Sequence, residues 1–345
     1  MWTKLFSILR NIGIEENIIK LIENLYNNQS AIIQVGTYYS KPAQIEKGVR
    51  QGCLISPSLF NIYAEEMMNE ALENINGVRI NGEIIKTIKF ADDQAIIATR
   101  RKDLMEMLEK INTTVELYGM KININKTKCM TFSKKPNIMN ITIGGNKIEQ
   151  VKKFRYLGQV LTEDAKCTEE IVTRIGQGKQ AFKKKERLIT TINMDEKLRK
   201  RILEAYVWNT ALYAAETWTL SKKDEQKLEA FEMWCWRRFN KVKWTDKKTN
   251  EEVLVITDEK RKFLHKIKTR RGRWFGHNLR LSKWFTLIVE GKISGRRPRG
   301  PPRKDFIKQI LVDTHSSSYQ ELKKKAFERK EWRRCFTSAT HQSID

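Results

Sequence analysis

Residues Ile88–Ile97 read Ile-Lys-Phe-Ala-Asp-Asp-Gln-Ala-Ile-Ile, so two adjacent carboxylates stand between two apolar, β-prone arms. Such arms predict a pair of strands, which places Asp92 and Asp93 at the tight connection between them. Carboxylate oxygens at a rigid hairpin tip suit Mg²⁺, a hard cation that often shares its ligands with phosphates. A plain surface turn is the commoner origin of an Asp-Asp pair, so the flanking sequence has to decide between the two interpretations.

The net charge of +25 is distributed unevenly along the 345 residues. Residues 1–91 contain nine basic and nine acidic side chains, whereas residues 136–345 contain 48 basic and 26 acidic ones. This segregation predicts a polyanionic partner, most simply nucleic acid. An evenly solvated basic surface would not explain it.

The five cysteines are scattered, and none forms a C-x-x-C pair. This usage is typical of reduced thiols in an intracellular protein, in the nucleus or the cytoplasm. The first residues lack the long apolar core of a signal peptide, and no apolar run is long enough to span a membrane. We therefore expect no membrane partner.

The first 165 residues mix helical and strand patterns. Helices are predicted for residues 2–27 with a break near Gly13, for residues 56–75, and around residues 104–115. The sequence Ser56-Pro57 predicts the start of the second of these, with the serine as N-cap. Asn81-Gly82 predicts a hairpin turn. The alternating residues 121–128 predict a half-buried strand, residues 141–148 a further hairpin, and residues 154–158 an extended segment.

From about residue 167 the pattern becomes helical. One apolar stripe contains Ile171, Ile175 and Phe182, and a second contains Leu198, Ile202, Ala205, Tyr206 and Leu212. Ser221 and Asp224 resemble a capping box before a third helix. Eight of the nine tryptophans lie beyond residue 200, and Trp208, Trp218 and Trp234 are expected in the core because they fall at helical spacing.

Taken together, these motifs resemble the palm of reverse transcriptases from non-long-terminal-repeat (LINE-type) retrotransposons. The resemblance rests on the order of the Gln51-Gly52 loop, the Ser56-Pro57 helix, the Phe90-Ala91-Asp92-Asp93 hairpin, the Asn125-Lys126-Thr127-Lys128 strand and the Tyr156-Leu157-Gly158 turn. It implies an α+β fold. Residues 1–165 would be a partial palm, residues 166–245 a helical thumb-like region and residues 246–345 a basic C-terminal region.

The resemblance also implies residue roles. Asp92 would be a ligand of both catalytic Mg²⁺ ions, with Asp93 beside it, and Gln51 and Gly52 would pack against the incoming nucleotide and the template. Lys126 would lie near the nucleotide triphosphate, although a solvated lysine is an equally good interpretation and Lys128 is the other candidate. Tyr156, Leu157 and Gly158 would form the primer grip. The partners would be an RNA template and a DNA primer, and the reaction an in-line attack of the primer 3′-hydroxyl with two metals.

One departure from the family pattern concerns the third carboxylate of the palm, which belongs on a strand before the Gln-Gly loop. Asp92 is the first aspartate in the sequence. The sequence therefore resembles a reverse transcriptase shortened at its N-terminus, without the fingers, and little or no polymerase activity is expected of it alone. The alternatives are a non-catalytic nucleic-acid-binding remnant of a retrotransposon and a decayed element copy.

Two basic segments near the C-terminal end are candidate nucleic-acid contacts. The first contains Arg270, Arg271 and Arg273 beside Trp274. The second contains Arg296, Arg297, Arg299, Arg303 and Lys304 among prolines and glycines. The second segment is similar to arms that enter the minor groove, and it is equally consistent with a linker or a nuclear-import signal.

Overall fold

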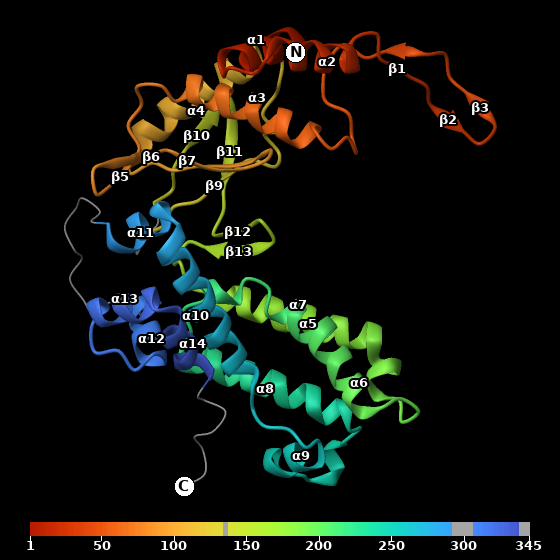
Figure 1. Ribbon diagram of the computed structural model, residues 1–345, viewed down its shortest axis with the longest axis vertical. Coiled ribbons are helices and arrows are strands. Elements are labelled where there is room, and N and C mark those ends of the chain that lie inside the picture. Colours follow the sequence, from red (N-terminus) through yellow and green to blue (C-terminus); the bar gives the residue numbers. More distant parts are fainter. Residues whose placement is uncertain (134–136, 292–305, 338–345) are drawn as a thin grey trace. The chain divides into compact units, whose positions relative to one another are not determined.

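The computed structural model describes residues 1–133, 137–291 and 306–337, which form a mixed α+β structure (Figure 1). The chain divides into two compact units. The first consists of Met1–Cys129 and Ile138–Gln150, and the second consists mainly of Val151–Gly291 and residues 306–337. The division falls near residue 150, before the boundary expected at residue 165.

Four helices build the core of the first unit. They are α1 (Trp2–Asn11), α2 (Glu16–Tyr26), α3 (Ser56–Ala71) and α4 (Arg101–Leu117). Leu9, Ile19, Met68 and Met107 are buried where these helices meet. The break near Gly13 is confirmed, and Gly119 follows α4 with φ = +67°, a conformation that favours glycine.

The strands of the first unit form small, mostly antiparallel pairs. The pairs are β1 (Ser30–Ala31) with β4 (Ala43–Gln44), β2 (Gln34–Val35) with β3 (Tyr38–Tyr39), β5 (Val78–Ile80) with β6 (Glu83–Ile85), β7 (Thr87–Phe90) with β8 (Asp93–Ile96), and β10 (Ile141–Ile143) with β11 (Asn146–Gln150). A short strand β9 (Lys128–Cys129) joins β11 in parallel. The predicted Asn81-Gly82 turn is confirmed, since both residues have positive φ.

The strand predicted over residues 121–128 is wrong except at its last residue. The main chain forms a turn instead, because the carbonyl of Asn123 accepts the amide of Thr127 at 2.9 Å and its side chain accepts the amide of Lys126 at 3.2 Å. Such side-chain bonds to nearby backbone compete with the strand ladder.

The second unit begins with a hairpin and continues as helices. The hairpin consists of β12 (Lys153–Tyr156) and β13 (Gln159–Thr162). The helices are α5 (Thr168–Thr190), α6 (Glu196–Ile202), a π-helix (Leu203–Trp208), α7 (Asn209–Ala211), a 3₁₀ turn (Ala215–Thr217), α8 (Lys222–Phe239), a 3₁₀ turn (Trp244–Asp246), α9 (Asn250–Ile256), α10 (Phe263–Leu281), α11 (Lys283–Glu290), α12 (Phe306–Asp313), α13 (Tyr319–Phe327) and α14 (Arg329–Thr337). In the described part of the chain, no helix combines the length and apolarity needed to span a membrane.

One large core spans much of the second unit. Trp208, Trp218 and Trp236 are fully buried in it, as expected for the first two. The same core includes Phe263 and Ile267, so residues on both sides of the boundary expected at residue 245 share it. A second cluster forms around α10 and α14. The capping box of Ser221 and Asp224 is confirmed.

The apolar stripe expected between Leu198 and Leu212 is partly wrong. Leu198 and Tyr206 are exposed, whereas Leu203 and Val207 are buried. The π-helix contains Leu203, Tyr206 and Val207. It has more residues per turn than an α-helix, so a period of 3.6 residues carried across it points to the wrong face.

Candidate active site and nucleic-acid interface

The two aspartates lie at the tip of the β7–β8 hairpin, as predicted. Phe90 pairs with Asp93, so Ala91 and Asp92 form the two-residue connection, and Ala91 adopts φ = +50°. Both carboxylates are exposed. The hairpin is attached to α3, because Lys89 forms an ion pair with Glu65 at 2.9 Å.

The residues around this tip provide only part of a metal site. Two adjacent carboxylates offer the oxygen ligands that Mg²⁺ prefers. Within residues 1–133, 137–291 and 306–337, no group of three or more His, Cys, Asp or Glu side chains converges to hold a metal ion. A pair of shared ions requires more donors than Asp92 and Asp93 supply. The described donor set therefore does not fit two metal ions.

The Gln51-Gly52 loop is held in place by Trp2, near the start of the chain. Trp2 donates its indole N–H to the carbonyl of Gly48 at 2.8 Å, and Gly48 and Gly52 have φ = +97° and +82°. The loop thus follows a path that only glycine adopts without strain. The sequence pattern did not indicate the role of Trp2, because a contact across 46 residues leaves no local signal.

Ser56 is the first residue of α3 and makes no capping hydrogen bond, so its predicted role as N-cap is wrong. It is buried, and its hydroxyl lies 3.3 Å from the hydroxyl of Tyr26. This contact satisfies the hydroxyl group and joins the start of α3 to the end of α2.

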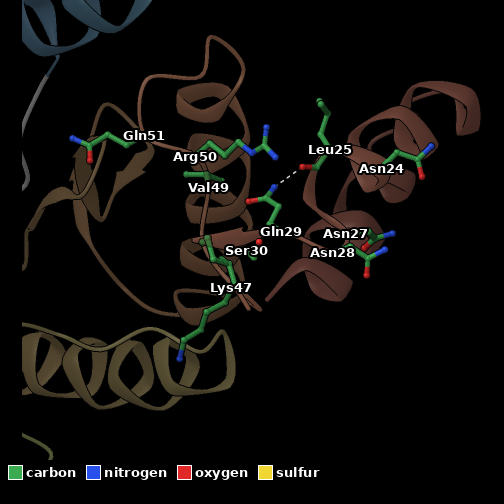
Figure 2. Close-up of a pocket in the computed structure, with 12 residues that line it drawn as sticks. Asn24, Leu25, Asn27, Asn28, Gln29, Ser30, Lys47, Val49, Arg50 and Gln51 are labelled. Atoms are coloured by element: carbon green, nitrogen blue, oxygen red, sulfur yellow. Dashed lines mark hydrogen bonds between the residues drawn. The ribbon is translucent and has the colours of Figure 1, made fainter. Parts of the chain in front are cut away.

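A polar hollow of about 640 Å³ lies between the end of α2 and the Gln51-Gly52 loop (Figure 2). It is lined by Asn24, Leu25, Asn27, Asn28, Gln29, Ser30, Ile45, Lys47, Gly48, Val49, Arg50 and Gln51. The lining contains two basic side chains, several amides and no acidic group. Amides and cations are suited to base edges and phosphates respectively.

Cys53 follows the Gln51-Gly52 pair and differs from the other cysteines. The backbone amide of Ile55 stabilises its thiolate and, together with the Ser56 side chain, lowers the pKa of the thiol. Burial raises the pKa of the Cys129, Cys167, Cys235 and Cys335 thiols.

We expect Cys53 to be alkylated first by iodoacetamide near neutral pH, by about tenfold over the others, because the thiolate is the reactive form. Peptide mass spectrometry of the folded chain after a short exposure measures this order. If the five cysteines of the folded chain were labelled as evenly as those of a urea-unfolded sample, the prediction would be contradicted.

The two candidate lysines differ in their surroundings. Lys126 lies exposed in the Asn123 turn and forms no ion pair with any residue of the described chain. Lys128 forms an ion pair with Glu149 at 2.6 Å. Of the two, Lys126 has the side chain that is available to a phosphate.

In the second unit, Tyr156 is the last residue of β12, and Leu157 and Gly158 form the turn to β13. Leu157 and Gly158 both have positive φ. On α5, Arg174 and Glu170 form a buried ion pair at 2.6 Å, and both side chains bind the backbone of this hairpin. Arg174 donates to the carbonyl of Gly158 and stacks on the ring of Tyr213.

Glu170 completes this attachment by accepting the amide of Val160 at 2.7 Å. Neither charged residue was predicted from the sequence. Their spacing of four positions was the available signal, because it places them on one helix face.

Of the first basic segment, only part faces solvent. Arg271 is 2% exposed and forms an ion pair with Asp313, so its guanidinium is held inside the unit. The prediction that Arg271 contacts nucleic acid is therefore wrong. Arg270 donates to the carbonyl of Leu212 and to Asn209. Trp274 packs on Phe285, and Arg273 remains exposed. Arg296, Arg297, Arg299, Arg303 and Lys304 lie outside the described residues.

Comparison with known proteins identifies the first part of the chain. Residues 1–161 match the family model described as "Reverse transcriptase (RNA-dependent DNA polymerase)". The chain thus carries a reverse transcriptase domain over these residues, and its relatives include proteins of a retrotransposable element and of a mobile element.

Three relatives illustrate the similarity. A transposon-derived protein of Caenorhabditis elegans is 24% identical over 62% of this chain and 79% of its own length. The Pol polyprotein from the type-2 retrotransposable element R2DM of Drosophila melanogaster is 23% identical over 45% of this chain and 15% of its own. The RNA-directed DNA polymerase from the mobile element jockey of Drosophila melanogaster is 24% identical over 48% and 18%. The chain therefore spans less than a fifth of the last two proteins.

Proposed function

We propose that this chain acts on primed nucleic acid as part of a reverse transcriptase, with the first unit as palm and the helices after residue 166 as thumb. The family match over residues 1–161, with Asp92 at the hairpin tip, is the observation that carries the proposal. The assigned roles are metal binding for Asp92 and Asp93, nucleotide and template contact for Gln51 and Gly52, and primer contact for Tyr156, Leu157 and Gly158. Lys126 would contact the triphosphate.

We further propose that this polypeptide has little or no polymerase activity by itself. Nucleotidyl transfer with two metal ions requires more donors than Asp92 and Asp93 supply. Asp92 is the first aspartate of the sequence, so the strand position before the Gln-Gly loop contributes no aspartate to such a site. The alternative function is nucleic-acid binding without catalysis, which the excess of basic residues after residue 135 favours.

Primer extension tests the catalytic part. The parent chain and Asp92→Asn are each given a primed RNA template, Mg²⁺ and deoxynucleotides, and circular dichroism establishes that both are folded. We expect no extension product from either chain. Synthesis by the parent that disappears in Asp92→Asn would refute the proposed inactivity and identify a working polymerase.

The binding part is tested separately with the same primed template. We expect an affinity that falls steeply with salt, because basic side chains release counterions from phosphates. A folded parent that does not bind at low salt would remove both the polymerase and the binding function.

A further inference from the structure

Trp244 is the most exposed tryptophan of the described chain. It lies in the 3₁₀ turn Trp244–Asp246, between α8 and α9, with 96% of its surface exposed. A folded protein normally buries an indole ring against other apolar groups. Since the ring is almost fully exposed here, both of its faces are available to a ligand.

The turn that carries this ring is firmly attached. Arg237 of α8 donates to the carbonyl of Lys248 and to the side chain of Asn250, both at 2.9 Å. The amide of Lys243 donates to Asp246 at 2.8 Å. A preorganised turn loses little conformational freedom when its ring binds a flat partner.

The charges around the ring indicate the chemistry of this partner. Lys241, Lys243, Lys247 and Lys248 are exposed, and Asp246 is the single acidic residue between positions 241 and 248. None of these lysines forms an ion pair with the residues that the structure describes. An aromatic ring among free cations is the combination that binds single-stranded nucleic acid, through a stacked base and adjacent phosphates.

A membrane surface fits the same segment less well. Interfacial binding requires a continuous apolar face. In residues 241–248 the other large apolar side chain is Val242, which packs against the core of the unit. Within this segment, a single ring would therefore be the whole apolar contact.

We propose that Trp244 stacks on an unpaired base of single-stranded nucleic acid, with Lys243 and Lys247 binding the flanking phosphates. The site deepens the proposed function and rests on it, because it needs a chain that binds nucleic acid. None of its residues is among those assigned by the family resemblance.

Fluorescence anisotropy with two probes tests this proposal on the full chain. One probe is a labelled deoxythymidine oligomer, and the other is an abasic oligomer of equal length. We expect Trp244→Ala to weaken binding of the first by about tenfold, within the range of one base–aromatic stack, and to leave binding of the abasic strand unchanged. Trp244→Phe should give an intermediate loss.

Val255→Ser is the matched control, because Val255 is exposed on the neighbouring helix but has no ring. It should bind both probes as the parent does. The double variant Lys243→Ala, Lys247→Ala should weaken binding of both probes equally and reduce the salt dependence of the affinity.

Three results would overturn the inference, each in a different way. If the parent binds and Trp244→Ala binds both strands with the affinity of the parent, the stacking site is wrong and the proposed function stands. If the folded parent binds neither strand, both fail. If Trp244→Ala loses binding to phosphatidylserine vesicles while binding both strands like the parent, the ring is a membrane contact.

Discussion

Replacing Arg174 with leucine is expected to lower the free energy of unfolding by about 3–5 kcal/mol, because it leaves the carboxylate of Glu170 buried without its partner. The side chains of both residues are less than a tenth exposed. The change also removes the donor to the carbonyl of Gly158 and the cation over the ring of Tyr213. Urea unfolding followed by circular dichroism measures the loss.

Hydrogen exchange distinguishes the loss of this attachment from a general loss of stability. The amide of Val160 donates to Glu170, so its protection in Arg174→Leu should fall more than that of amides in α8. Arg155→Leu is the matched control, since Arg155 is exposed on the same hairpin and its loss should cost about 0–1 kcal/mol.

A double-mutant cycle adds the final test of this pair. Glu170→Leu with Arg174→Leu removes both charges together, so the double variant should lose clearly less than the sum of the two single losses. Additive losses would show that the two side chains do not act as a buried pair.

The elements that could be predicted from the sequence are those specified by neighbouring residues. Asn81-Gly82 specifies its turn because both residues tolerate positive φ, and Ser221 with Asp224 closes a capping box within one helical turn. The Asp92 hairpin belongs to the same group. In each case the signal and the structure lie within a few residues of each other.

Errors arose where the local rule met a competing contact. The side chain of Asn123 binds nearby backbone and so removes the predicted strand, and the π-helix before Trp208 changes the register of the apolar stripe. The fixed parts of the candidate site could not be predicted for another reason. Trp2 and Arg174 contact backbone 46 and 16 residues away. The spacing of Glu170 and Arg174 indicates their ion pair, but no local pattern indicates which backbone group either Trp2 or Arg174 binds.

Arg271 shows how charge alone misleads. Beside Arg270 and Arg273 it has the composition of a nucleic-acid contact, yet its ion pair with Asp313 joins α10 to α12 inside the unit. A basic cluster on a helix has several faces, and the one that faces the core is used for structure. Prediction of the interface therefore needs the burial of each side chain.

Gly272→Ala and Gly276→Ala are expected to destabilise the second unit, although alanine is the better helix former. In an exposed helix, replacing glycine with alanine raises the free energy of unfolding by about 1 kcal/mol. Here a Cβ atom at Gly272 would overlap the ring of Phe336, and one at Gly276 the indole of Trp332. Both rings are buried, and Trp332 donates to the carbonyl of Gly272 at 2.9 Å, so neither can move aside easily.

Overpacking of this kind costs about 1–3 kcal/mol, which exceeds the gain in helix propensity, so each variant should unfold at lower urea than the parent. Gly176→Ala on α5 is the matched control, since a Cβ atom there meets nothing within 4 Å. It should raise stability by roughly 0.5–1 kcal/mol. The opposite signs of the two effects isolate the packing of α14 on α10 from helix propensity. If Gly272→Ala and Gly276→Ala stabilised the chain as Gly176→Ala does, the close approach of these two helices would be refuted.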